Sequence, residues 1–88
     1  MSCTVRVPSP LRSYTGGASR VSAEGGSLSE VMASLDARFG GIRFRIVDEQ
    51  GRIRPHIRLY VNTGEATNLA EPVRPGDTVH IICALSGG

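Results

Sequence analysis

The chain contains no lysine and no tryptophan, so all ten of its basic residues are arginines. It therefore offers no side-chain amine that could accept an isopeptide bond or form a Schiff base. The longest apolar stretch, residues 79–85, is interrupted by His80 and is far shorter than the roughly 20 residues that cross a bilayer. We therefore expect no membrane span. The first ten residues have neither a basic start nor an apolar stretch of signal-peptide length, and we expect a cytoplasmic protein.

The sequence has only two cysteines and two histidines, at positions unsuited to metal binding or catalysis. Cys3 and Cys83 form no Cys/His cluster at zinc spacing, and we interpret both as buried small apolar residues. His56 and His80 have no cysteine or carboxylate at ligand or triad spacing, and no glycine-rich phosphate-binding motif is present. We therefore expect no catalytic residue, no metal site and no bound cofactor.

Size and composition indicate one small globular domain. Of the 88 residues, 40% are hydrophobic and 20% are charged, a balance that excludes a disordered acidic tail or a coiled coil. Eight acidic residues leave a net charge of +2, which by itself is too small to indicate binding to nucleic acid or to an anionic membrane.

Alternation of apolar and polar residues predicts four main strands. These strands cover residues 3–7, 19–23, 57–62 and 78–85. The turn-rich loop 8–17 should join the first two into a hairpin, and Thr63-Gly64 should turn the third into a short return strand.

One amphipathic helix is predicted to begin at Leu28. Ser27 can cap its first amides, and Glu30, three residues on, completes a capping box. Apolar residues at helical spacing form one stripe, which consists of Leu28, Val31, Met32, Leu35 and Phe39. Gly40 and Gly41 should end the helix in the left-handed conformation. Such a helix packs its stripe against a sheet.

The rest of the chain is less regular. Residues 42–55 are rich in arginine and carry a turn signal at 48–51, so we expect short strand or helical turns there. Leu69 and Val73 should hold the following loop to the core. Residues 74–77 have proline and glycine in the two central positions of a type II turn.

The order strand, strand, helix, strand, short strand, strand favours an α+β fold of the β-grasp (ubiquitin-like) type, with a mixed sheet wrapped around one main helix. In that fold the first and last strands lie parallel at the sheet centre. Cys3 and Cys83 should then be too far apart for a disulfide, whose Cα atoms lie within about 7 Å. We expect the domain to span 1–85 and a Ser-Gly-Gly tail to span 86–88.

Residues of the C-terminal part carry a resemblance to a known family. They are Tyr60-Val61-Asn62, Pro75-Gly76-Asp77-Thr78-Val79 and residues 81–85 followed by Ser86-Gly87-Gly88. Together they resemble the signature of the ThiS/MoaD sulfur-carrier family. The loop 8–17 and the helix start at Ser27-Leu28 match the longer members, so the resemblance covers nearly the whole chain. It is closer to MoaD and the CysO-type carriers than to the shorter thiamin carriers. Cys83 departs from the pattern, since many members have proline near this position.

The resemblance implies that Gly88 is the site of covalent modification. A ThiF/MoeB-like adenylyltransferase would use ATP to adenylate the Gly88 carboxylate, and a sulfur donor would then displace AMP and leave a thiocarboxylate. Gly87 and Gly88 lack Cβ atoms and can enter a narrow channel at little steric cost. A sulfur-accepting biosynthetic enzyme would be the second partner. The sulfur could serve cysteine, molybdopterin or a secondary metabolite such as a thiosugar.

One sheet face is the predicted docking surface for the adenylating enzyme. If the apolar alternates of the strands point to the core, the opposite face carries Arg6, Arg58, Tyr60, His80 and Ile82. Tyr60 and Ile82 would be its apolar anchors, and the arginines would set orientation.

Two other functions stay open at this point. A protein modifier would be attached through Gly88 to lysines of other proteins, although the absence of lysine denies this chain side-chain links for polymers. An RNA-binding module would use the arginines of residues 43–58. The chain has four aromatic residues, and Phe39 belongs to the helix stripe, so few rings are available to stack on bases. Nucleic acid is therefore the less favoured partner.

Overall fold

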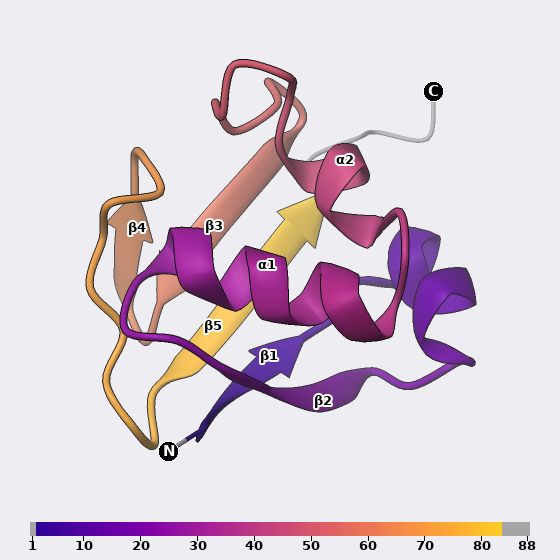
Figure 1. The fold of residues 1–88 in the computed structure, drawn as a ribbon, viewed down its shortest axis with the longest axis horizontal. Helices are drawn as coiled ribbons and strands as arrows, with labels where there is room; N and C mark the ends of the chain where they lie inside the picture. Colours follow the sequence, from indigo (N-terminus) through magenta and orange to yellow (C-terminus); the bar gives the residue numbers. More distant parts are fainter. Residues whose placement is uncertain (1, 84–88) are drawn as a thin grey trace.

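The computed structural model describes residues 2–83. Its five strands are β1 (Ser2–Arg6), β2 (Arg20–Glu24), β3 (Ile57–Val61), β4 (Gly64–Ala66) and β5 (Thr78–Cys83). They form one sheet in the order β2-β1-β5-β3-β4, in which β1 and β5 are parallel at the centre and the other pairs are antiparallel. Helix α1 (Leu28–Arg38) crosses one face of this sheet (Figure 1). The arrangement confirms the predicted β-grasp fold.

Helix α1 begins as the capping residues predict. The Ser27 Oγ accepts a hydrogen bond from the Glu30 amide at 3.3 Å, while the Glu30 carboxylate accepts one from the Gly26 amide at 2.7 Å. The return bond of the capping box thus goes to the residue before the cap. The expected stop is partly wrong. Only Gly41 is left-handed, with φ 97°, and it precedes a second short helix, α2 (Ile42–Ile46).

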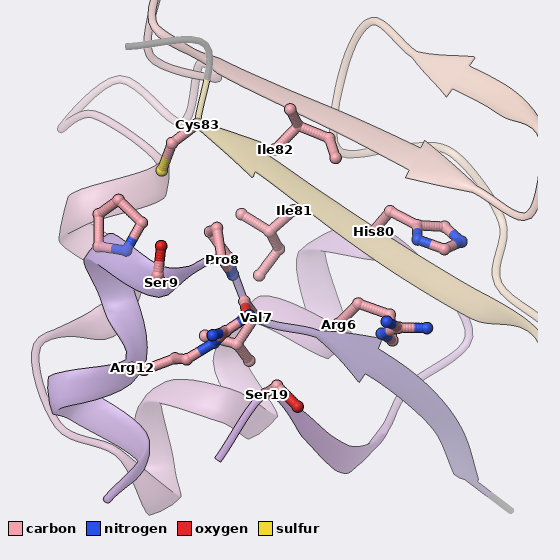
Figure 2. Close-up of a pocket in the computed structure, with 11 residues that line it drawn as sticks. Arg6, Val7, Pro8, Ser9, Arg12, Ser19, His80, Ile81, Ile82 and Cys83 are labelled. Carbon is pink, nitrogen blue, oxygen red and sulfur yellow. The ribbon is translucent and has the colours of Figure 1, made fainter. Parts of the chain in front are cut away.

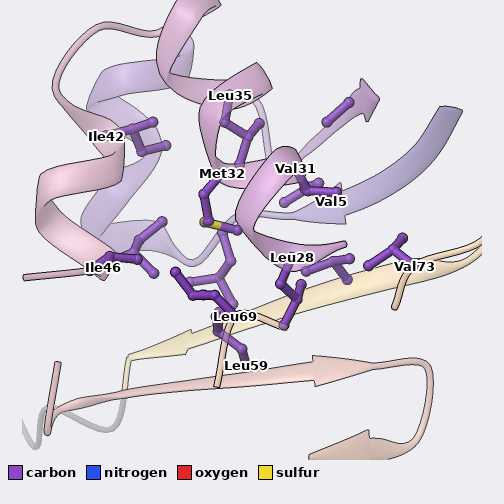
Figure 3. Close-up of a cluster of buried hydrophobic side chains, with 14 of the residues drawn as sticks. Val5, Leu28, Val31, Met32, Leu35, Ile42, Ile46, Leu59, Leu69 and Val73 are labelled. Atoms are coloured by element: carbon purple, nitrogen blue, oxygen red, sulfur yellow. The ribbon is translucent and has the colours of Figure 1, made fainter. Parts of the chain in front are cut away.

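The apolar stripe of α1 packs on the sheet. Leu28, Val31, Met32 and Leu35 are fully buried and contact the inward side chains of the central strands (Figure 3). Burial of each such side chain stabilises the fold by about 1.5–3 kcal/mol. The fifth residue of the stripe, Phe39, is only half-buried, because the helix ends before it and its ring packs against the Arg38 guanidinium, 4.8 Å away.

The connection between β1 and β2 differs from the predicted loop. The two strands form the expected antiparallel hairpin, but residues between them form a 3-10 helix, η1 (Ser9–Thr15). The prolines at its start fix their φ angles in the helical range, and Leu11 is buried in the core. The Thr15 hydroxyl donates to the Ala18 carbonyl at 2.8 Å and closes the turn.

The later loops follow the sequence predictions. After α2, a bridge between Val47 and Ile53 and the turn at Asp48 hold the arginine-rich segment in short turns. Leu69 and Val73 are buried, and Gly76 takes φ 87° in the predicted turn. Of the last predicted strand, residues 84 and 85 lie outside the described residues.

Within residues 2–83, no helix is long and apolar enough to cross a membrane. The same residues contain no group of three or more histidine, cysteine, aspartate or glutamate side chains that could hold a metal ion.

Candidate functional site

The sheet face opposite α1 brings the five predicted docking residues together. Strand register places His80 of β5 between Arg6 of β1 and Tyr60 of β3, and places Ile82 beside Arg58. All five belong to three neighbouring strands and point away from the helix, because their inward neighbours are the core residues. The five residues therefore lie together on one continuous surface of the sheet.

The face combines an apolar centre with positive charge. Ile82 exposes 44% of its surface, while Tyr60 and His80 are half-buried beside it. The Arg58 guanidinium lies 3.1 Å from the Glu65 carboxylate of β4, a partner that the sequence did not indicate. Both side chains of this pair are exposed, so it adds little stability but offsets the charge of Arg58. Among residues 2–83, Arg6 has no such partner.

A pocket of about 460 Å³ opens beside this face. It lies between η1 and the ends of β1 and β5 (Figure 2). Its polar and reactive lining includes Arg6, Arg12, Ser9, Ser19, His80 and Cys83. The pocket extends the predicted docking face towards the end of β5, five residues before Gly88.

Arg12 is the residue of this site that sequence reasoning missed. Its Nε donates a hydrogen bond to the Val7 carbonyl at 3.0 Å, which holds the guanidinium at the pocket wall near Arg6. The sequence around Arg12 is typical of an ordinary turn, so it gives no sign that Arg12 belongs to the site. Arg12 reaches the sheet only because η1 folds against the end of β1. Two arginines at one pocket favour an anionic group from a binding partner.

The two cysteines are free, as predicted. Cys3 is buried, and burial raises the pKa of its thiol. Cys83 is half-buried rather than buried, because it lines the pocket, and burial raises its pKa as well. Both thiols are therefore mainly protonated at neutral pH and are weak nucleophiles.

The predicted modification site, Gly88, and the tail residues Ser86 and Gly87 lie outside the described residues. The described part of the chain ends at Cys83, on the central strand β5 and at the pocket. The candidate site is therefore a surface next to Cys83, the last described residue.

Comparison with known proteins decides the family. The sequence matches the ThiS family over residues 5–88, which includes the C-terminal Gly88. The chain belongs to the ThiS family. It is thus one of the ubiquitin-like sulfur carriers, whose members are small carriers rather than catalysts.

The similarity to individual ThiS relatives extends over full chains. The sulfur carrier protein CysO of Mycobacterium tuberculosis is 37% identical over 93 residues, and the match covers all of both chains. The crystal structure of that CysO superposes with a TM-score of 0.89 at 35% identity, covering 94% of this chain and 99% of the other. This ThiS-family chain is therefore a homologue of CysO.

Two further structures extend the comparison. CysO of Amycolatopsis orientalis, crystallised in complex with BexX, superposes with a TM-score of 0.90 at 35% identity, covering 98% of this chain and 99% of the other. Small archaeal modifier protein 1 of Haloferax volcanii superposes with a TM-score of 0.83 over the whole of both chains, at 20% identity. The second likeness shows the fold alone.

Proposed function

We propose that this protein carries sulfur as a thiocarboxylate on Gly88. The observation that carries the proposal is the ThiS-family match, which runs through the last residue of the chain. A partner enzyme of the ThiF/MoeB type would transfer AMP from ATP to the Gly88 carboxylate and release pyrophosphate. A sulfide equivalent would then attack the acyl carbon, and AMP would leave.

This chemistry explains why the carrier needs no catalytic side chain. A free carboxylate is a poor electrophile, and its adenylate is a good one because AMP is a good leaving group. The partner enzymes supply the ATP site, the base and the groups that stabilise the oxyanion. The carrier supplies a substrate end on a rigid domain. Because the reaction consumes ATP, we also place the protein in the cytoplasm.

We propose the sheet face as the docking surface for the adenylating enzyme. Ile82 would fill an apolar depression on that enzyme, with Tyr60 beside it. Arg6 and Arg12 would receive carboxylates of the enzyme at the neighbouring pocket. The surface borders the end of β5, so docking there would bring the tail to the enzyme.

We further propose cysteine biosynthesis as the destination of the sulfur, because the curated relatives are CysO carriers. Incubation of the thiocarboxylated protein with O-phosphoserine and the accepting enzyme should then yield cysteine and regenerate the carboxylate. Transfer of the sulfur to a molybdopterin precursor or to a thiosugar acceptor, with no transfer to O-phosphoserine, would contradict cysteine biosynthesis as the destination. The complex of Amycolatopsis orientalis CysO with BexX supports a partner enzyme that binds the carrier directly.

Intact-mass measurement tests the central step. With ATP, the adenylating enzyme and a sulfide source, the protein should gain roughly 16 Da, located at Gly88, as sulfur replaces oxygen. Deletion of Gly88 should abolish the gain, because the carboxylate would then stop one residue, about 3.5 Å, short of the reacting position. Gly88→Ala is the matched control, since it keeps the chain length and should retain part of the gain. An unchanged gain after deletion of Gly88 would refute the proposal.

The alternatives have no comparable support. The modifier function would require conjugates through Gly88, and the likeness to small archaeal modifier protein 1 concerns the fold alone. A ladder of Gly88-dependent conjugates on immunoblots would favour it.

A further inference from the structure

The arginine-rich segment accounts for the positive charge of the protein. Residues 42–58 hold five arginines and two acidic residues, and the rest of the chain holds five arginines and six acidic residues. Without this segment the chain would be slightly acidic. The excess positive charge therefore comes from one segment of the chain. Within it, Arg52 pairs with Asp48, and Arg58 pairs with Glu65 on the docking face. The remaining arginines of the segment form no ion pair with described residues and can attract a partner of opposite charge.

An exposed aromatic residue lies within that charge. Phe44 exposes 55% of its surface, although its neighbours in α2, Ile42 and Ile46, are completely buried. The Arg54 guanidinium lies over the ring, 4.5 Å from its centroid, and Arg54 Nε donates a hydrogen bond to the Phe44 carbonyl at 2.7 Å. Because α2 is anchored in the core and Arg54 is held on it, the two side chains are ordered before any partner arrives.

Both residues of this pair line a pocket of about 300 Å³. The pocket is lined by Glu49 and by four residues that we call the platform, namely Phe44, Arg45, Arg54 and His56. Of the residues that the structure describes, none forms an ion pair with Arg45 or Arg54. The platform thus offers an apolar ring flanked by two arginines that form no direct ion pair with these residues, although the Glu49 carboxylate lies in the same pocket.

The platform lies close to the end of β5 but is separate from the docking face. The Arg54 carbonyl accepts a hydrogen bond from the Ile57 amide at 2.9 Å, and Ile57 pairs with Cys83 across the sheet. Figure 1 shows α2 on the same side of the sheet as α1, near the tip of β5. The platform therefore lies near Cys83, the last described residue of the strand that leads towards Gly88 in the sequence.

We propose that the platform binds an acidic protein surface with one protruding apolar side chain, on an enzyme that acts on the C terminus. The inference rests on the proposed carrier function for its partner. Carboxylates of that surface would pair with Arg45 and Arg54, and the apolar side chain would pack on the Phe44 ring. A protein fits better than RNA, because the platform has a single aromatic ring on which a base could stack.

The test is an NMR titration of the isotope-labelled full-length chain with an eight-residue peptide that has one central leucine among glutamates. Amide signals of residues 43–56 should shift, and those of β1 and β5 should stay in place. Phe44→Ala and Arg54→Gln should each weaken binding by roughly threefold to tenfold. Arg20→Gln is the matched control, because it removes one exposed arginine from the edge strand β2 and should leave the affinity nearly unchanged.

Several outcomes would overturn the proposal. They are the absence of any shift at millimolar peptide, shifts centred on the docking face, and an equal loss in Arg20→Gln. Tighter, steeply salt-dependent binding of an oligouridine to the platform would show a nucleic-acid surface instead. The 16 Da mass gain of the protein with its natural sequence is measured in a separate experiment, without the peptide. A failed titration with a normal gain would therefore reject the platform alone, and a missing gain would reject the carrier function.

Discussion

The Asn62 side-chain amide donates a hydrogen bond to the Asp77 carboxylate at 3.0 Å and thereby joins the turn after β3 to the turn before β5. The Asn62 side-chain carbonyl accepts a second bond, from the Thr78 amide, at 3.0 Å. Asn62 is also the only described non-glycine residue with positive φ, 56°. Two turns far apart in sequence therefore depend on one side chain, at the end of the sheet opposite Cys83.

Substitution of Asn62 should destabilise the protein in two separable ways. Asn62→Ala loses both side-chain hydrogen bonds and places an unsuitable residue in the left-handed region, for a total of about 2 kcal/mol in urea unfolding. Asn62→Gly loses the same bonds but accepts the backbone angle, so its loss should be about 1 kcal/mol. Equal losses in both variants would show that the backbone angle contributes nothing.

Asp77 should make stability depend on acid pH. Hydrogen bonds from the Arg74 amide and from Asn62 lower the pKa of its carboxyl below the ordinary value of 3.8. Because the folded state favours the ionised form, this contribution is present above pH 3.8 and is lost as the pH falls through the folded pKa. Unfolding followed from neutral to acid pH should therefore give a smaller slope for Asp77→Asn than for the natural chain. The slope should not vanish in Asp77→Asn, because Asp48 still contributes to the pH dependence of stability. Its pKa is lowered mainly by the hydrogen bond from the Arg52 amide.

Gly25 should be the most sensitive glycine of the described chain. A Cβ there would lie 2.7 Å from the Glu30 Cβ and 2.8 Å from the Val31 nitrogen, and φ is 143°. Gly25→Ala must therefore displace the start of α1, and we expect a loss of about 2–4 kcal/mol in the free energy of unfolding. Gly51→Ala is the control, because its Cβ would meet nothing within 4 Å, and its φ of 78° alone should cost about 1 kcal/mol. Similar losses at both sites would contradict the close contact.

Most of the fold could be predicted because its signals act over a few residues. Ser27 and Glu30 mark the start of α1, and alternation sets the inward face of each strand. The 3-10 helix at residues 9–15 could not be predicted in the same way. Its prolines are equally typical of a turn, and its form depends on the burial of Leu11, a contact with distant parts of the chain.

The candidate site divides along the same line. His80 and Ile82 could be placed on the outer face because side chains alternate along a strand. Arg12 and Phe44 could not be placed, because each stands in an irregular segment whose path is set by tertiary contacts. The exposure of Phe44 depends on which residues of α2 turn inward, and a helix of one and a half turns has too few residues for its period to be read.

Ile82→Arg should disrupt the proposed docking face without disrupting the fold. Ile82 is exposed, so the new charge stays in water, but it would have to enter the apolar contact with the adenylating enzyme. We expect thiocarboxylate formation to slow by at least about tenfold, mainly through a higher KM, with the melting temperature nearly unchanged. Thr67→Arg, on an exposed loop residue, is the control and should react normally. An Ile82→Arg protein with unchanged kinetics would remove the docking face from the proposal.

Alkylation of Cys83 should link the pocket to activation. Cys83 is half-buried and lines the pocket, whereas only 4% of Cys3 is exposed, so iodoacetamide should modify Cys83 alone in the folded protein. Burial raises the pKa of the Cys83 thiol. Iodoacetamide should therefore alkylate Cys83 more slowly at neutral pH than it alkylates a cysteine in an unstructured peptide, and the rate should increase with pH. The added group would occupy space near Arg12 and should slow the 16 Da gain. Cys83→Ser should be activated equally before and after treatment, and slowing of that variant would show that the reagent acts elsewhere.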